Sequence, residues 1–224
     1  MAALGTGVYP LRPVLTTVPR PRLGRLFVTM ARRTEFDGDY YARFYEDDPV
    51  HTRTKIAQLA SAVHSFANWW DLPVRNVLDI GAGPGYWRDW YAENHPGVRY
   101  LSTDVSEHAC TEYGHELRDI TAWRPRGEFD LVVCHGVLHY LDPDGASRAI
   151  ENIAAASRGL LYLEAPTSMD LDTIVDTETT DMNVTRRSAN WYRTRLLEHF
   201  VQIGAGLWVS HKAGLPLYEL ERSR

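Results

Sequence analysis

The sequence predicts an α/β fold in which a mostly parallel sheet is covered by helices on both faces. From residue 38 onward, short apolar runs typical of buried strands alternate with segments of helical periodicity. Such alternation produces a doubly wound parallel sheet with right-handed crossovers. Near the carboxyl terminus the alternation stops and glycine-separated apolar runs follow each other directly, which predicts an antiparallel hairpin. The 224 residues suffice for one such domain and are too few for two ordinary ones.

Two helices are expected before the first strand. Tyr40 pairs with Phe44, and Tyr41 with Tyr45, at a spacing of four residues, which predicts a short aromatic helix. A longer helix is expected over residues 56–67, because apolar side chains recur there on one face. These side chains are Ile56, Leu59, Ala60, Val63, Phe66 and Ala67.

The body of the domain alternates strand and helix. The first expected strand covers residues 76–80, and a helix through Trp87, Trp90 and Tyr91 follows it. The further expected strands are 98–102, 116–118, 129–134 and 159–163, with helices at 107–113 and 146–155. Residues 165–187 are polar and acid-rich without a clear period, which indicates an insertion near the carboxyl edge of the sheet. A helix at 189–199 and strands at 200–203, 206–210 and 215–221 complete the expected order.

The charge distribution argues against nucleic acid and membrane partners. Residues 1–34 contain six arginines and no acid, so leaving them out changes the net charge from −5 to −11. A body this acidic repels phosphate backbones, and no run of about 18 apolar residues exists that could cross a membrane. Two cysteines, Cys110 and Cys134, are too few for a disulfide scaffold and fit a reducing cytoplasm.

Residues 1–37 are expected to be a basic leader ahead of a single domain at 38–224. The leader is acid-poor like a transit peptide, but it lacks serine and a regular amphipathic spacing. We interpret it as a flexible tail, or as an over-long start with Met30 as the true first residue.

The strongest chemical signal is the run from Asp79 to Gly85, DIGAGPG, at the end of the first strand. Glycines there let the backbone turn sharply and approach a ligand more closely than a β-carbon would allow. Asp104 follows the second strand, where its carboxylate can accept hydrogen bonds from ribose hydroxyls. The dinucleotide fingerprint requires glycine or alanine where Tyr86 stands, so a nicotinamide oxidoreductase is the weaker interpretation.

Over residues 38–222 the chain resembles the class I S-adenosylmethionine-dependent methyltransferases. The motifs that carry the resemblance are DIGAGPG at 79–85, STDVS at 102–106, RDI at 118–120, FDLVVCHGVLHYL at 129–141 and LLYLEAP at 160–166. The resemblance implies a Rossmann-like seven-stranded sheet of order 3-2-1-4-5-7-6 with an antiparallel last strand. It also implies S-adenosyl-L-methionine as cofactor and methyl transfer to a nucleophile.

The resemblance assigns cofactor contacts residue by residue. The amino-acid part of the cofactor is expected at Asp79, Gly81, Ala82, Gly83 and Gly85, the ribose at Asp104, and the adenine at Asp119 and Ile120, with Val105 and Cys134 as further contacts. A sulfonium donor carries no phosphate, so carboxylates beside its ammonium and ribose suit it chemically. The donor's own carboxylate needs a cation, for which His51 and Arg53 are candidates. Tyr41 and Tyr45 either cover the methionine tail with their π faces or serve packing alone.

The catalytic candidates follow the fourth and fifth strands, which end at the same edge of the sheet. They are His135, His139 and Glu164. Methyl transfer to a hydroxyl requires in-line alignment and removal of the hydroxyl proton, a role that suits histidine. In sugar O-methyltransferases of this superfamily, a histidine and an acid act together at positions that this sequence resembles at His139 and Glu164. The alternative is a histidine that only packs or caps a helix.

The insertion suggests the class of acceptor. Its acids, Asp170, Asp172, Asp176, Glu178 and Asp181, precede a segment that contains Arg187 and Trp191. Carboxylates around an aromatic platform are typical of sites for polyhydroxylated ligands, so a sugar or glycoside hydroxyl is the expected acceptor. Its expected contacts are Tyr41, Trp87, Tyr140, Arg187 and Trp191. We assign no metal ligands, although some of the acids could instead coordinate a divalent cation such as Mg²⁺, or simply be solvated.

Two other functions stay open at this stage. Methyl transfer to nitrogen or to a carboxylate of a metabolite or natural product would use the same cofactor site without a histidine base. A non-catalytic cofactor-binding domain would use that site alone. In each case we expect a small-molecule partner, no nucleic acid or membrane, and a monomer or homodimer.

Overall fold

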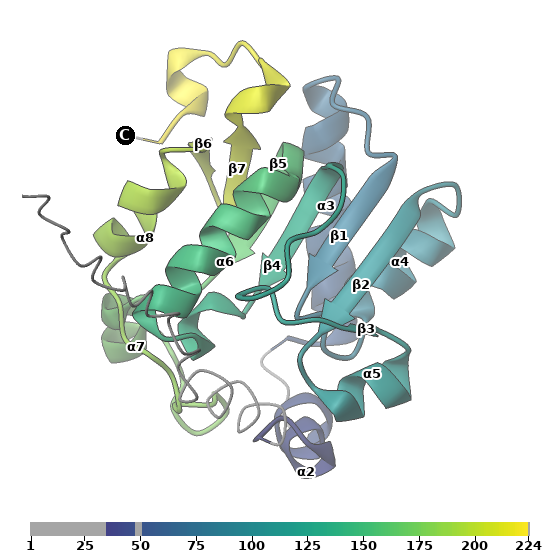
Figure 1. Cartoon of the computed structure of the whole chain (residues 1–224), viewed down its shortest axis with the longest axis vertical. Helices are drawn as coiled ribbons and strands as arrows, with labels where there is room; N and C mark the ends of the chain where they lie inside the picture. The colour runs from purple at the N-terminus through teal and green to yellow at the C-terminus, as the bar shows by residue number, and fades with distance from the viewer. Residues whose placement is uncertain (1–34, 48–50, 224) are drawn as a thin grey trace, which may run out of the picture.

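The computed structural model describes residues 35–47 and 51–223 and contains the expected seven-stranded sheet (Figure 1). The strand order is β3-β2-β1-β4-β5-β7-β6, and β7 runs antiparallel to both of its neighbours. The strands are β1 Asn76–Ile80, β2 Arg99–Asp104, β3 Glu116–Leu117, β4 Phe129–His135, β5 Ser157–Glu164, β6 Phe200–Gly204 and β7 Leu207–Ser210. Both the sheet order and the antiparallel last strand confirm the prediction.

The helices alternate with the strands as expected. The α-helices are α2 Gly38–Tyr41, α3 Arg53–Trp69, α4 Tyr86–Asn94, α5 Glu107–Tyr113, α6 Pro143–Ala156, α7 Ser168–Thr173 and α8 Ala189–Leu196. Shorter elements are the π-helix η1 Ala42–Asp47 and the 3₁₀ turns η2 Leu138–Tyr140, η3 His211–Ala213 and η4 Glu219–Glu221. Helix α6 begins three residues earlier than the apolar pattern suggests, because Asp142 caps it and Pro143 occupies its first position.

Helices cover both faces of the sheet, and the central strands are buried on both sides. On β4, Leu131 and Val133 pack in the layer with α3 and α4, whereas Val132 and Cys134 belong to the layer with α6 and α8. This division follows from the alternation of side chains along a strand. Figure 1 shows α6 and α8 on the near face and α3 and α4 on the far face. Phe66, expected on the buried face of α3, is exposed.

The predicted strand at 215–221 is wrong, and the hairpin consists of β6 and β7 instead. Pro216 lacks a backbone N–H, and Glu221 turns back to accept hydrogen bonds from the Tyr218 N–H and the Trp70 indole. These bonds favour the turn η4 over pairing with the sheet. Tyr218 and Leu220 are exposed, as expected outside a sheet.

The insertion after β5 is anchored to the domain by its two ends. At its start, Thr167 and Asp170 form a capping box that begins α7. At its end, the buried Arg187 donates hydrogen bonds to the carbonyl oxygens of Leu138 and Leu141. The insertion is therefore held beside η2 at the carboxyl edge of the sheet.

Cys110 and Cys134 are not joined in a disulfide, and only Cys134 is fully buried. Within the described ranges, no helix is long and apolar enough to cross a lipid bilayer. Most of the predicted leader, residues 1–34, lies outside the described residues.

Candidate active site

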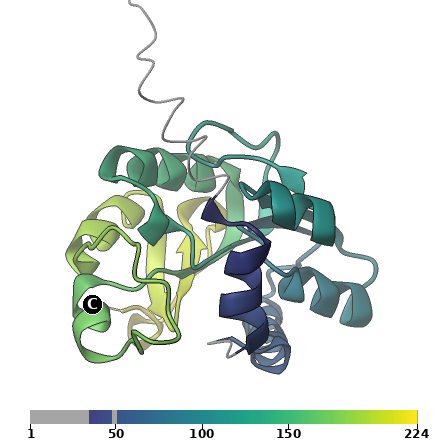
Figure 2. The ribbon, with the colours of Figure 1, turned by 90° about the horizontal axis from the view of Figure 1, so that it is seen from below.

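A cavity of about 590 Å³ lies along the carboxyl ends of β1, β4 and β5. Its wall includes the glycine loop after β1, the turn that contains η2, the start of the insertion, and the aromatic helix formed by α2 and η1. The starts of α3 and α4 complete this wall. Figure 2 views this edge and shows α2 and η1 lying across it. The cavity is thus at the switch point of the sheet, where α/β folds bind their ligands.

The glycine loop has the conformation that its sequence predicts. Gly81, Gly83 and Gly85 all have positive φ, and the N–H groups of Gly81 and Ala82 donate to the carbonyl oxygen of Thr103 at 2.8 and 3.0 Å. A β-carbon at Gly81 would lie 2.4 Å from a methyl carbon of Val137. Glycine is therefore required there by backbone conformation and by space.

Asp79 lies below this loop and faces the cavity while being almost fully buried. The Tyr100 hydroxyl donates to its carboxylate at 2.9 Å. Burial nevertheless raises the pKa of Asp79 to about 7, because the Tyr100 hydrogen bond and the Arg88 charge offset it only in part. A ligand ammonium would compensate this buried carboxyl, so the site fits the amino-acid part of the expected cofactor.

Asp104 stands at the end of β2 as predicted, but it does not line the cavity. Its carboxylate accepts hydrogen bonds from the N–H groups of Gly83 and Ser106 at 3.0 and 2.9 Å. Tyr45 covers this region, with its hydroxyl 3.5 Å from the point where a β-carbon on Gly83 would be. Tyr41 stacks on Tyr45 at a centroid distance of 5.2 Å. Asp104 is therefore almost fully buried, and its carboxylate is engaged by backbone N–H groups.

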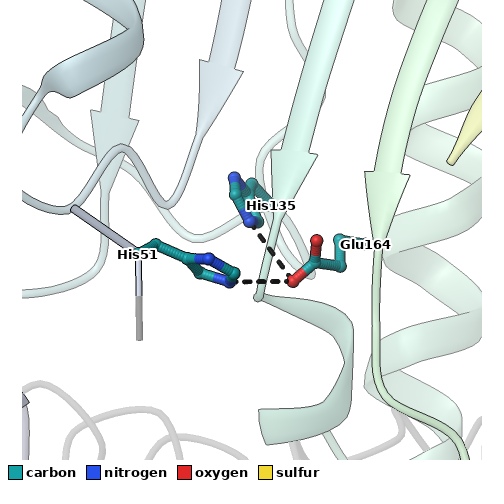
Figure 3. Close-up of side chains that lie close together, drawn as sticks. All are labelled: His51, His135 and Glu164. Carbon is teal, nitrogen blue, oxygen red and sulfur yellow. Dashed lines mark hydrogen bonds and ion pairs between the residues drawn. The ribbon is translucent and has the colours of Figure 1, made fainter. Parts of the chain in front are cut away.

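Glu164, at the end of β5, meets two imidazoles (Figure 3). Its Oε1 lies 3.2 Å from Nε2 of His51 and 3.3 Å from Nε2 of His135, and its Oε2 accepts a hydrogen bond from Tyr162 at 3.1 Å. Burial alone would raise the pKa of Glu164, but the two imidazoles outweigh it and hold the pKa well below its usual range. The indole of Trp87 donates to Nδ1 of His135 at 3.2 Å.

His139 also lines the cavity, in the turn η2, and is almost fully buried. Its ring packs against Tyr140, and its carbonyl oxygen accepts the Thr185 N–H at 2.7 Å. The partners that the structure gives Glu164 are His51, His135 and Tyr162, not the expected His139. The two catalytic candidates thus share the cavity without forming the expected pair.

Several predicted site residues lie outside the cavity wall. Arg53 is paired with Asp89 at 2.8 Å and with Glu93 at 3.4 Å, so it is engaged on the outer surface of α4. Arg187 is occupied by backbone carbonyls, and Trp191 packs between Arg187 and Arg195. The remaining residues outside the cavity wall are Tyr41, Gly85, Val105, Asp119, Ile120 and Cys134. Of these, Ile120 and Cys134 belong to the hydrophobic core.

Sequence reasoning missed His115, which supports the glycine loop. Its Nε2–H donates to the carbonyl oxygen of Gly83, and its Nδ1 accepts from the Ser102 hydroxyl, both at 2.9 Å. Burial lowers the pKa of His115, which suits this neutral form. His115 only precedes a two-residue strand in the sequence, so no local pattern indicates this role.

Comparisons with known proteins identify the family. The family model described as "Methyltransferase domain" matches residues 51–210. Trans-aconitate 2-methyltransferase of Mycobacterium tuberculosis is 32% identical over 72 residues, which are 30% of this chain and 28% of that protein. The matched segment thus spans well under half the length of that relative.

Several solved structures share the fold. The magnesium protoporphyrin IX methyltransferase of Synechocystis, solved with bound S-adenosylhomocysteine, has a TM-score of 0.55 at 20% identity, covering 81% of this chain and 97% of that one. DesVI of Streptomyces venezuelae has a TM-score of 0.51 at 14% identity, covering 69% of this chain and 90% of that one. Given the family match over most of its length, the chain belongs to the class I S-adenosylmethionine-dependent methyltransferases.

Proposed function

We propose that the protein transfers the methyl group of S-adenosyl-L-methionine to a hydroxyl of a small molecule, and that this acceptor is a sugar or glycoside. The observation that supports the proposal is a single cavity that brings Asp79 and the glycine loop together with three histidines, Glu164 and the insertion. The groups proposed to bind donor and acceptor thus face one cavity, as transfer between two ligands requires.

The residues around Asp79 are suited to the donor. Asp79 pairs with the ammonium, the backbone of Gly81 to Gly83 holds the amino-acid part, and Asp104 receives the ribose once Tyr45 moves aside. S-adenosyl-L-methionine, when bound, supplies an electrophilic methyl group on a positively charged sulfur.

His139 is the proposed base for the acceptor hydroxyl. It lines the cavity four residues beyond His135, and an imidazole can accept a proton near neutral pH. Glu164 and His135 are assigned to the orientation of the acceptor, because both face the same cavity. Trp87 and Tyr140 supply aromatic surface beside these groups.

The charges around the cavity support a polyhydroxylated acceptor over an anionic one. Asp170, Asp176 and Asp181 line the side formed by the insertion, and among the described residues no lysine or arginine lines the cavity. Each of these carboxylates already accepts one backbone N–H, which fixes its position. Sugar hydroxyls can donate to such carboxylates, whereas a carboxylate acceptor would be repelled.

Carboxyl methylation is the second candidate, because the Mycobacterium tuberculosis relative is named as a methyltransferase of trans-aconitate. The two candidates differ in the charge of the acceptor. Incubation of the purified chain with labelled S-adenosyl-L-methionine and a panel of sugars, phenols, amines and trans-aconitate separates them by mass detection of the product. We expect methylated sugar. Methylated trans-aconitate would contradict the proposal, and cofactor binding with no product from any acceptor would indicate a non-catalytic domain.

A substitution tests the base. His139→Ala is expected to lower the rate of hydroxyl methylation by about 10²–10⁴-fold while cofactor binding, measured by calorimetry, is unchanged. His211→Ala, at an exposed histidine beyond β7, is the matched control and should leave the rate unchanged. A His139→Ala enzyme of normal rate would exclude His139 as the base.

A further inference from the structure

Three segments of the chain bring metal-ligand atoms to one point in the cavity wall (Figure 3). His51 precedes α3, His135 ends β4 and Glu164 ends β5. The two Nε2 atoms lie 3.2 and 3.3 Å from the same carboxylate oxygen, and all three atoms lie within 4.8 Å of one another. We propose that His51, His135 and Glu164 bind a first-row transition metal dication such as Zn²⁺.

An unsatisfied nitrogen supports this assignment. Nε2 of His135 is buried and makes no hydrogen bond, although it lies 3.3 Å from Glu164 Oε1, because the contact is not aligned for one. A buried polar atom without a partner requires an explanation, and an ion is one of the few available. In a tetrahedral site, ligand atoms about 2.1 Å from a common ion lie about 3.4 Å from each other, close to the 3.2 and 3.3 Å from the two imidazole nitrogens to the carboxylate oxygen.

The types of ligand select the metal. Two imidazoles and one carboxylate suit Zn²⁺, Fe²⁺ and Co²⁺, whereas Mg²⁺ prefers a shell of oxygen atoms. The proposed site also differs in place from the acids of the insertion, where the sequence suggested Mg²⁺. Two of those acids already have partners within the insertion: Asp172 pairs with Arg186, and Asp170 accepts the Thr167 N–H in the cap of α7.

The residues behind the ligands orient them. The Tyr162 hydroxyl binds Oε2 of Glu164 and leaves Oε1 directed at the two imidazoles. Such partners are a regular part of metal sites because they fix the direction of the ligand atom. All three ligands line the cavity, so the free coordination positions of the ion face the space proposed for the acceptor. A water or hydroxyl oxygen is the ligand that fits them.

The hydrogen bond from Trp87 to His135 competes with metal binding and lowers the affinity for the ion. Its indole N–H can only donate, so Nδ1 of His135 must present a lone pair, and the metal-free ring carries its proton on Nε2. Metal binding at Nε2 moves this proton to Nδ1 and breaks the hydrogen bond from Trp87. One neutral hydrogen bond corresponds to about a five-fold effect on an equilibrium, whereas coordination by three side chains amounts to several orders of magnitude. We therefore expect the metal ion to bind despite the loss of the Trp87 hydrogen bond.

Metal titration of the full-length chain tests the site without any acceptor, so its outcome is separate from that of the proposed function. After treatment with EDTA and dialysis, the protein is titrated with Zn²⁺, Co²⁺ or Mg²⁺. We expect one tightly bound Zn²⁺ per chain, a visible absorption spectrum of coordinated Co²⁺, and no comparable binding of Mg²⁺. Absence of a one-to-one Zn²⁺ complex would overturn the proposal.

Matched variants locate the site. His51→Ala and Glu164→Gln should each weaken Zn²⁺ binding by at least about 100-fold. The surface cluster of Glu151, Glu198 and His199 provides the controls, because Glu198→Gln and His199→Ala change the same residue types elsewhere. These controls should keep the affinity of the wild type. Loss of Zn²⁺ binding in the controls, with binding retained in His51→Ala, would assign the ion to the surface and overturn the proposal.

Trp87→Phe gives a readout that a merely structural role would not produce. Removal of the competing indole N–H should raise Zn²⁺ affinity about five-fold. A lower affinity in this variant would contradict the coordination through Nε2 of His135.

The His51→Ala variant also needs a folding control, which thermal melting provides. His51 is the partly exposed histidine of the cluster, so its replacement should leave the fold intact.

Discussion

Two carboxyl groups face the same cavity, and their surroundings shift their pKa values in opposite directions. Burial raises the pKa of Asp79 to about 7, with only Tyr100 and the more distant Arg88 to offset it. Glu164 is also buried in part, but His135 and His51 lower its pKa well below the usual range. The protein thus supplies Glu164 with two imidazole partners and leaves Asp79 without an adequate one. Asp79 is therefore suited to a ligand that brings its own cation, and the two ends of the cavity have different tasks.

Paired amide substitutions test this division most strongly. Asp79→Asn removes the partner of the cofactor ammonium and should weaken S-adenosyl-L-methionine binding by about 100-fold, as expected for a buried charged contact. Glu164→Gln makes the same chemical change at the other end and should alter cofactor affinity by less than about three-fold. Isothermal calorimetry with both variants measures the difference. Equal losses in the two variants would mean that the ends are not distinct.

A β-carbon should destabilise the protein more in the glycine loop next to Asp79 than in an open surface turn. Gly81→Ala should lower the free energy of unfolding by at least about 2 kcal/mol, because the φ of +66° and the contact with Val137 both oppose a β-carbon. Gly97→Ala is the control, since a β-carbon there meets nothing within 4 Å. Urea denaturation measures both, and a Gly81→Ala protein as stable as the control would show that the loop adapts.

The raised pKa of Asp79 predicts how cofactor binding depends on pH. In the ligand-free protein the carboxyl is protonated below about pH 7, so the cofactor must displace a proton and its affinity should fall by up to about ten-fold per pH unit below that point. Above about pH 8 the amino group of the cofactor loses its charge, and affinity should fall again. Calorimetry across this range should give a maximum between these limits. The acid limb should be absent in Asp79→Asn.

The same protonation affects stability with a definite sign. Because the folded-state pKa lies above the unfolded value of about 3.9, the folded protein holds this proton more tightly. Asp79 therefore contributes stability at low pH that is lost as the pH rises through about 7. The difference in unfolding free energy between the wild type and Asp79→Asn should therefore change with pH between about pH 3.9 and about pH 7. A difference that stays constant over this range would contradict the raised pKa.

The sequence predicts the Asp79 end of the cavity better than the Glu164 end. The glycine loop and Asp79 are adjacent in the chain, so one local motif specifies their conformation and chemistry. Glu164 is predicted at the end of a strand, but its partner His51 is 113 residues away, and no local pattern joins the two. Arg53 and Arg187 mislead for a related reason, because a charge in a sequence does not reveal whether an acid or a carbonyl already satisfies it.

The sequence predicts the aromatic helix but not that its Tyr45 covers the region of Gly83 and Asp104. Its periodicity correctly indicates a helix, yet the position of Tyr45 over Gly83 follows from tertiary packing. The covered Asp104 is the result, and it could be found only once α2 and η1 are placed against the sheet. The failed strand at 215–221 has a local cause instead, since Pro216 and the Glu221 cap are both visible in the sequence.

The smallest expected effect concerns the link between the aromatic helix and η2, which joins the two ends of the cavity. The hydroxyl groups of Tyr40 and Tyr140 lie 3.0 Å apart, and burial and the nearby charge of Asp181 both raise the pKa of Tyr140. Either hydroxyl can be the donor of this hydrogen bond. Tyr40→Phe removes one of the two hydroxyl groups and should cost about 1 kcal/mol or less in unfolding free energy. Tyr140→Phe leaves the Tyr40 hydroxyl without this partner and also removes the hydroxyl near the Asp181 charge, so it should cost more. In the double variant the cost should be less than the sum, because no Tyr40 hydroxyl remains unpaired. Urea denaturation of the three variants measures this order, and strictly additive costs would contradict the link.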